Sequence, residues 1–398
     1  MTEAGLKRRI GPGLMTAYGV GVMVGAGIYV LIGAVAGLAG SYAPLAFLLA
    51  GLVAAPSALT YAELSARIPE AAGEAAYVAQ AFGTTLLPVA IGLAIVLAGT
   101  VSGAAVLRGG VGYLTALVSV TPVWAIVAIG AALTLVAIAG VLESLALAAL
   151  FTVVEVIGLV LVSSAGLMAE PVAVAVPEVA PGAMAVLAAT ALAFFAFIGF
   201  EDVVNMAEEA REPERTMPRA IIASLLITAV LYALVSFAAL RAVPAADLAA
   251  SERPLALVWE RATGQGAGFL AAIAVLAALN GVLAQLVMAA RVLFGLGRRS
   301  RAFAPFTHAH PRFGTPVLAS LTCGAALIGA ALALPVAQLA EIASMVLLAV
   351  FAAVNTSLIA LKLHSPQAPF RVPMVVPVVG LVAALAALGL SLAERIAP

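Results

Sequence analysis

Two adjacent carboxylates, Glu201 and Asp202, are the residues of this chain most able to do chemistry, because they follow an apolar run that Gly199 interrupts. A charged side chain at membrane depth costs about 2.5 kcal/mol or more and has to face a cavity or a partner. No lipid-facing helix would carry such a pair. We therefore expect both carboxylates to lie inside a helical bundle beside a polar pathway, which indicates membrane transport.

A second interruption lies near the start of the chain, where residues 24–28 read Val-Gly-Ala-Gly-Ile inside the first hydrophobic segment. A helix broken at mid-membrane exposes free amides at one half-helix end and free carbonyls at the other, each end carrying roughly half an elementary charge. Amides after Gly25 suit a carboxylate, and carbonyls of residues 194–197 suit an ammonium group. Paired broken helices thus predict a site for a zwitterion. The alternative is that Gly25 and Gly27 only let two helices pack closely.

The composition requires a membrane. Hydrophobic residues make up 64% of the 398, charged residues 10%, and the mean hydropathy is +1.19, so we expect an all-α polytopic protein in a lipid bilayer. The formal net charge of zero argues against nucleic-acid binding. Cys323 is the single cysteine, and His308 and His310 have no third ligand nearby, so we expect neither a metal nor a cofactor.

Hydropathy divides the chain into about 11 transmembrane segments of roughly 20 residues each. The short basic stretch Lys7-Arg8-Arg9 predicts a cytoplasmic N-terminus, and most of the other Lys and Arg then also lie inside, which predicts a multi-pass protein of the cell inner membrane. The expected segments are 15–39, 43–66, 86–107, 123–141, 144–168, 184–209, 218–241, 266–297, 316–335, 338–362 and 375–393.

Three stretches between these segments are polar. Residues 67–85, with Glu70 and Glu74, predict a short amphipathic surface helix on the cytoplasmic side, the alternative being a binding element. Residues 242–264 predict an external loop that folds back onto the bundle. Residues 298–315 form a basic internal loop whose charges the topology explains.

The sequence also resembles a known family. GVGVMVGAGIYVLIGAVAGLAG and FAFIGFEDVVNMAEEAREPERTMPRAI are similar to segments of the amino acid-polyamine-organocation superfamily, specifically of bacterial amino acid permeases related to the cationic amino acid transporters. Glu209, Pro213, Arg215, Pro218 and Arg219 match its E-x-x-x-P-x-R-x-x-P-R pattern. The stretches NGVLAQLVMAARVLFGLGRRS and HPRFGTPVLA are also family-like.

This resemblance implies the LeuT-like fold, a 5+5 inverted repeat with broken first and sixth helices. Residues 15–363 would form the ten-helix core, with repeats at about 15–168 and 184–363. Residues 1–14 would be the cytoplasmic tail, and 364–398 an extra eleventh helix and C-terminus. The family often has twelve spans, so an end after eleven leaves the oligomeric state open.

The resemblance places the substrate between the first, third, sixth and eighth helices, with Phe195 as the gate. Ala98 stands where the cationic transporters carry a Glu, so we expect a neutral substrate; the alternative is that Glu201 pairs with a cationic amino acid or a polyamine. The expected substrate-binding residues are Met23, Val24, Gly25, Ala26, Gly27, Ile28, Val101, Phe194, Phe195, Phe197, Ile198, Phe200, Leu283 and Ala284.

Two further features of the sequence predict which ion drives transport. Residues 281–291 contain no Ser or Thr, so a sodium ion would lack the hydroxyl ligands that sodium symporters of this fold supply. Twelve residues after Glu143, where many relatives have a Lys, stands Glu155. Glu155 and Glu201 are therefore our candidates for proton coupling, the alternative for Glu155 being a permanently protonated hydrogen-bond donor. For Asp202 we expect a structural role, and Arg291 is a candidate partner for Glu208 or Glu209.

Together these features predict a secondary amino acid transporter, not an enzyme, that is proton-coupled, sodium-independent and selective for neutral amino acids. An exchanger is the nearest alternative. An ion channel would need a continuous polar pore, and an intramembrane enzyme a catalytic His or Ser set, which this sequence does not display.

Overall fold

The computed structural model describes residues 10–70, 73–115, 117–139, 142–172, 182–251, 253–310 and 314–396. These residues form helices, and their only β-pairing is an isolated bridge between Ile10 and Ala210. The expected all-α class is confirmed. Most of the predicted tail, residues 1–9, lies outside the described part.

Fourteen α-helices and four 3-10 helices are described, and Pro122, Pro213 and Pro254 occupy first positions of helices, where the missing N–H has no intrahelical partner to lose. The α-helices are α1 (Pro12–Ala39), α2 (Ala43–Arg67), α3 (Gly73–Phe82), α4 (Leu86–Thr115), α5 (Pro122–Ala139), α6 (Leu142–Met168), α7 (Ala183–Phe194), α8 (Pro213–Ala242), α9 (Ala245–Ala250), α10 (Pro254–Thr263), α11 (Gly268–Arg299), α12 (Val317–Ala333), α13 (Val336–His364) and α14 (Val375–Ile396). The 3-10 helices are η1 (Gly40–Tyr42), η2 (Phe195–Phe197), η3 (Asp202–Glu209) and η4 (Arg301–Thr307).

Within the described residues, eight segments are long and apolar enough to cross a membrane, one of which, Leu31–Arg67, takes in the end of α1 and all of α2. Val317–Ala333 and Val375–Gly389 are shorter apolar helices. Each of the eleven segments expected from hydropathy overlaps a helical element, the sixth being α7 with η2 and η3. The chain is thus a polytopic membrane protein, and eleven crossings stay a prediction.

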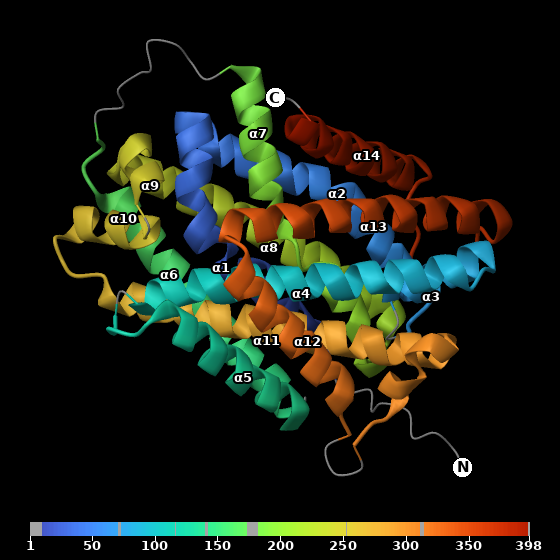
Figure 1. The fold of residues 1–398 in the computed structure, drawn as a ribbon. Helices are drawn as coiled ribbons and strands as arrows, with labels where there is room; N and C mark the ends of the chain where they lie inside the picture. The colour runs from blue at the N-terminus through green and yellow to red at the C-terminus, as the bar shows by residue number, and fades with distance from the viewer. Residues whose placement is uncertain are drawn as a thin grey trace.

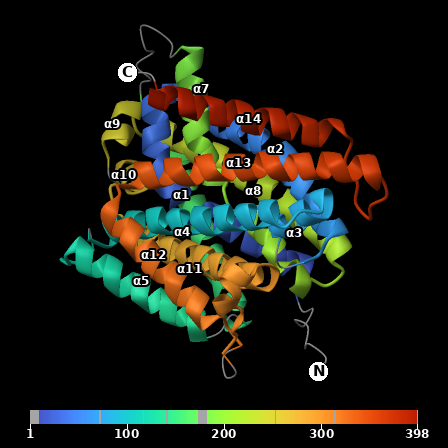
Figure 2. The same ribbon diagram turned by 45° about the vertical axis from the view of Figure 1, so that its right-hand side comes forward.

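The long helices lie side by side in one bundle, with α4 along α11 and α2 along α8 (Figures 1 and 2). The short helices α9 and α10 lie at one end of the bundle and α3 lies at the other (Figure 1). Leu255 and Val258 of α10 are buried, so the polar stretch 242–264 does fold back onto the bundle. The inverted repeat of residues 15–168 and 184–363 stays a prediction.

Both predicted helix interruptions are present. Inside α1, Gly25 has non-helical backbone angles (φ 4°, ψ −153°). In the sixth segment α7 ends at Phe194, and Gly199 has φ 128°, a conformation that side chains other than glycine rarely adopt. A Cβ at Gly199 would lie 2.8 Å from Cγ1 of Val22 and 3.2 Å from the amide nitrogen of Met23. The two breaks therefore lie in direct contact.

The first half of α3 is not a surface helix, which corrects the expectation for residues 67–85. Residues Gly73 to Val78 are buried, and α3 packs against α4 and α13. The amphipathic pattern was real, but its apolar face and Glu74 both point into the protein, since Glu74 is only 1% exposed. Gln80 remains exposed.

Candidate functional site

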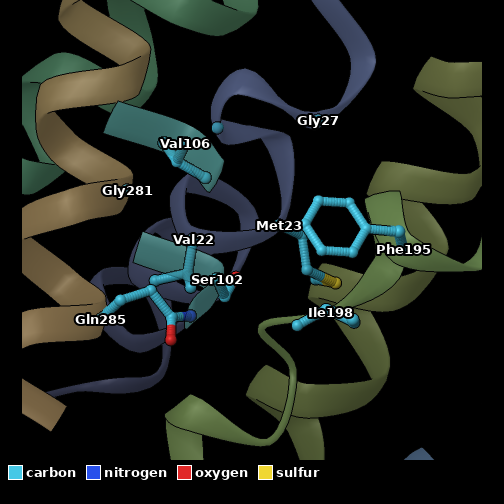
Figure 3. Close-up of a pocket in the computed structure, with 10 residues that line it drawn as sticks. Val22, Met23, Gly27, Ser102, Val106, Phe195, Ile198, Gly281 and Gln285 are labelled. Carbon is cyan, nitrogen blue, oxygen red and sulfur yellow. The ribbon is translucent and has the colours of Figure 1, made fainter. Parts of the chain in front are cut away.

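A small cavity lies where the two broken segments meet α4 and α11 (Figure 3). Its walls come from the first, third, sixth and eighth expected segments, the four that the family resemblance implied. The lining residues are Val22, Met23, Gly25, Gly27, Ser102, Val106, Phe195, Ile198, Gly281 and Gln285.

Helical spacing explains which side chains reach the cavity. Ser102 and Val106 are four residues apart on α4, and Gly281 and Gln285 are four apart on α11, so each pair shares one helix face. Figure 3 shows the Phe195 ring beside the Met23 side chain. The cavity volume is about 20 Å³, which holds roughly one water molecule. Lining groups must move before an amino acid fits.

Tyr232 of α8 connects the two breaks. Its hydroxyl oxygen lies 2.6 Å from the carbonyl oxygen of Met23 and 3.0 Å from that of Ala196. Its ring packs edge-on against Phe197 at 5.3 Å and Phe47 at 5.6 Å. A buried tyrosine hydroxyl needs a polar partner, and carbonyls released by a helix break supply one. This role of Tyr232 was not foreseen, although a tyrosine inside an apolar span was the available signal.

The two glycines of the first break differ in their surroundings. A Cβ at Gly25 would meet nothing within 4 Å, whereas a Cβ at Gly27 would lie 3.3 Å from Cα and 3.4 Å from Cβ of Ala196. Gly25 thus faces open space at the cavity, and Gly27 allows the two broken segments to approach. Of the carbonyls considered for an ammonium group, that of Phe195 accepts the amide of Ile198 at 3.2 Å.

The other expected substrate residues lie outside the cavity walls. Phe197 packs on Tyr232, while Phe194 and Phe200 pack on Phe351 at 6.2 and 5.2 Å between ring centroids. The residues expected in the site that do not line it are Val24, Ile28, Val101, Phe194, Phe197, Phe200, Leu283 and Ala284. The side chain of Ala26 lies outside the described part of the structure.

The residues not foreseen in the walls are Val22, Ser102, Val106, Gly281 and Gln285. On α11 the expectation was displaced by one or two positions, and each position turns the side chain by about 100° around the helix axis. Leu283 therefore faces a separate apolar cluster that includes Cys323 of α12. The usable signal was polarity, because Ser102 and Gln285 are polar residues within long apolar helices.

Gln285 links the cavity to the paired carboxylates. Its amide nitrogen donates to Oδ2 of Asp202 at 2.5 Å. The neighbouring Glu201 accepts the amide of Gly199 at 2.9 Å, so its carboxyl binds the backbone of the break itself. Both carboxyl groups are buried, Glu201 being 2% and Asp202 1% exposed. Asp202 thus contacts a residue of the cavity wall, and Glu201 holds the turn at Gly199.

Glu155 lies apart from the cavity, between α6, α11 and α1. Its Oε1 accepts from the side-chain amide of Asn280 at 3.2 Å, and its Oε2 has no hydrogen-bond partner. The hydroxyl of Tyr29, from the second half of α1, lies 3.3 Å from the backbone carbonyl of Glu155. Among the described residues no ion pair involves Glu155. The side chains of Glu143 and Ser144 lie outside the described part.

Of the two partners expected for Arg291, the structure shows Glu209, at 3.0 Å between Nη2 and Oε1. A second guanidinium nitrogen of Arg291 lies 3.0 Å from the sulfur of Met206. Arg291 thus ties α11 to the end of η3, where the family-like pattern begins.

Two helices broken at a shared cavity inside a polytopic bundle are features of a membrane transporter. The chain belongs to the amino acid permease family, whose model matches residues 15–393.

Among characterised relatives, the branched-chain amino acid permease BcaP of Bacillus subtilis is 34% identical over 202 residues, covering 49% of this chain and 43% of that protein. Cationic amino acid transporter 4 of Mus musculus is 32% identical over 364 residues, covering 83% of this chain and 56% of that protein. The methylthioribose transporter of Bacillus subtilis is 32% identical over 207 residues, covering 51% and 44%. The chain thus spans about half the length of these relatives.

Proposed function

We propose that this protein is a secondary amino acid transporter of the cell inner membrane that prefers neutral amino acids, couples their movement to protons and does not use sodium. The observation that carries the proposal is the contact between the two helix breaks at the cavity, where Gly199 lies against Val22 and Met23. Membership of the amino acid permease family supports amino acids as the substrate class.

The backbone at the breaks suits the two charges of an amino acid. The amides after Gly25, at Ala26 to Ile28, would bind the carboxylate, because they stand at the start of a half-helix. Carbonyls at the end of α7 would bind the ammonium group. Tyr232 bonds to the carbonyls of Met23 and Ala196, and so would keep the two broken segments in a fixed relative position.

The side-chain part of the cavity supports a neutral substrate. Val22, Met23, Val106 and Ile198 are apolar, and they leave a cationic side chain without a counter-charge in the walls. Ala98 is 1% exposed and lies one helical turn from Ser102, which lines the cavity. A cationic substrate, as in the name of the relative in Mus musculus, would instead need Asp202 to release Gln285 and face the cavity.

Proton coupling is assigned to Glu155 and Glu201. Both are buried, and neither takes part in an ion pair among the described residues. The absence of hydroxyl side chains in residues 281–291 supports independence from sodium. A proton gained or lost in the bundle changes the relative stability of two conformations, which is what coupling requires.

Transport would proceed by alternating access, with one set of helices rocking against the other around the site. In this conformation the cavity, at about 20 Å³, is too small for an amino acid. Phe195, which lies in the wall beside Met23, is the side chain whose rotation would open it, and we assign it the gate. The cytoplasmic side would be the end that carries α3 and the arginines Arg298, Arg299 and Arg301.

The test is counterflow in proteoliposomes. Vesicles loaded with unlabelled leucine should accumulate labelled leucine, with saturation by substrate and with no effect of replacing sodium by choline. An inward proton gradient should then raise net uptake. Linear, unsaturable flux without counterflow would indicate a channel, and counterflow that ignores the proton gradient would indicate an exchanger. No flux of any amino acid would contradict the proposal.

A further inference from the structure

Glu74 is a buried carboxyl group that the proposed transport cycle has not used so far. It lies in the first turn of α3, at the end of the bundle away from α9 and α10 (Figure 1). Its side chain is 1% exposed, and its Oε1 has no hydrogen-bond partner among the described residues. Burial raises the pKa of Glu74 from 4.5 to about 8, with a further upward contribution from the charge of Glu201.

Glu74 faces the two carboxyls that follow the break in the sixth segment. The ring of Tyr61 from α2 packs edge-on against Tyr77 of α3 at 6.4 Å and against Phe200, the residue before Glu201, at 5.7 Å, which places α3 beside this pair. The hydroxyl of Tyr61 neighbours the Glu74 carboxyl. Tyr77, one turn further along α3, also faces this group. Four separate elements, α2, α3, η3 and the turn at Gly199, thus bring these acidic and phenolic groups together.

The cations of the two helices that pack against α3 have other partners. On α13, which packs against α3, Lys362 pairs with Glu63 at 2.7 Å. The single charged residue of α4, Arg108, donates to the carbonyl of Ala331. Neither helix therefore supplies Glu74 with a counter-charge.

On α11, Arg298 lies over the ring of Phe294 at 4.9 Å, and the other two arginines pair with other carboxylates. Arg291 pairs with Glu209 at 3.0 Å and Arg299 with the exposed Glu70 at 3.2 Å. Among the described residues no ion pair reaches Glu74, Glu201 or Asp202. Like charges at close range disfavour one another, so three buried carboxyls without a paired cation favour a state in which one of them holds a proton.

Unpartnered polar atoms surround this proton-holding group. The hydroxyl of Tyr77 and both amide atoms of Asn205 are buried with no hydrogen-bond partner among the described residues. Asn205 lies against the start of α3, since its Oδ1 would be 2.9 Å from a Cβ at Gly73. Buried polar atoms of this kind are few in folded proteins, and a bound water is one way to satisfy them.

A series of polar groups lies between the cavity and the end of the bundle at α3. Gln285 lines the cavity and donates to Asp202, which is adjacent to Glu201, which acts on Glu74. Glu70, which lies three residues before the start of α3, is exposed. The series thus runs from the cavity to Glu74, four residues along the chain from the exposed Glu70.

We propose that Glu74 carries the coupled proton between the Glu201–Asp202 pair and the aqueous phase at the α3 end of the bundle. The step is a proton transfer: the O–H bond of a protonated carboxyl of the pair breaks, a new O–H bond forms on the Glu74 carboxylate, and the negative charge moves the opposite way. Glu74 then exchanges its proton with water. The inference rests on the proposed proton-coupled transport and adds the residue through which the proton reaches the aqueous phase.

The experiment compares Glu74→Gln with Glu70→Gln in proteoliposomes made from the full chain. Glutamine keeps the size of the side chain but cannot carry the proton. Proton-driven accumulation of leucine should fall by about tenfold or more in Glu74→Gln, as expected when a proton-transfer group is removed. Counterflow without a proton gradient should persist, and its pH dependence should flatten. Glu70→Gln, which alters an exposed carboxyl in the same segment, should match the wild type in both assays.

Wild-type accumulation and a wild-type pH profile in Glu74→Gln would overturn the proposal. If that variant does not fold, Glu74→Asp decides: a displaced pH profile supports the relay, and an unchanged profile overturns it. Counterflow by the wild type separates failure of the proposed function from failure of the relay. If the wild type shows no counterflow, amino acid transport itself is contradicted. If it does show counterflow and the Glu74 variants behave like the wild type, only the relay is contradicted.

Discussion

The hydroxyl of Tyr232 lies 2.6 Å from the carbonyl oxygen of Met23, which places a polar group of α8 directly on the break in α1. The same hydroxyl lies 3.0 Å from the carbonyl of Ala196 in the other broken segment. A hydroxyl carries one proton, so the two carbonyls share it, and a shift of either segment would favour one bond over the other. Tyr232 is therefore positioned to report the relative movement of the two breaks.

Tyr232→Phe should weaken amino acid binding by about fivefold, because a buried hydrogen bond is worth roughly 1 kcal/mol and its loss would free the carbonyls to reorient. The measurement is the rise in melting temperature on adding leucine. Tyr113→Phe is the matched control, since its hydroxyl also donates to a backbone carbonyl, that of Tyr29, without contact to the cavity walls. Equal losses in both variants would contradict a specific role for Tyr232.

Ala98→Glu should shift selectivity toward cationic amino acids. A carboxylate one turn from Ser102 would supply the counter-charge that the walls lack, so arginine should gain about tenfold over leucine in competition for uptake. Ala98→Gln adds the same bulk without the charge and should leave the ranking unchanged. Arginine as the best competitor of the wild type would show that Glu201 or Asp202 already recognises the side chain.

Glu155→Gln should retain counterflow but flatten the rise of uptake at low external pH, because glutamine mimics the protonated carboxyl. Its acceptor bond from Asn280 at 3.2 Å can be kept by the amide oxygen. Glu201→Gln tests the second candidate in the same assay. Unchanged pH profiles in both variants, or uptake stimulated by sodium, would assign the protein to facilitators or exchangers.

Glu74 should also make the folded protein less stable in alkali. Its pKa is about 8 in the folded state against 4.5 normally, so the folded state holds a proton that the unfolded state has lost. This stabilisation is complete below pH 4.5 and disappears as the pH rises through 8. Between pH 7 and 9 the loss is about 1.4 kcal/mol.

The corresponding measurement is the melting temperature in detergent across this pH range. Glu74→Gln should remove most of the fall above pH 7, whereas Glu70→Gln should reproduce the wild-type curve. A fall of equal size in the Glu74 variant would mean that other groups cause it.

The sequence by itself determined the membrane class, the approximate helix positions and both interruptions. These properties depend on local features, namely apolar runs of membrane length and glycines that disfavour a continuous helix. Gly199 with φ 128° and the irregular backbone at Gly25 were therefore predictable. The partner of Arg291 was narrowed to two neighbouring residues, of which the structure shows Glu209.

Only the tertiary structure decided which side chains meet. Leu283 and Gln285 are two positions apart, yet only Gln285 lines the cavity, because the rotation of α11 depends on its packing against α4. Tyr232 and Glu74 lie far along the chain from the breaks they approach, so no local pattern predicts their contacts. Glu74 in particular resembles a surface residue in sequence. It is buried because α3 packs between α4 and α13, and that packing places its carboxyl among the acidic groups of the sixth segment.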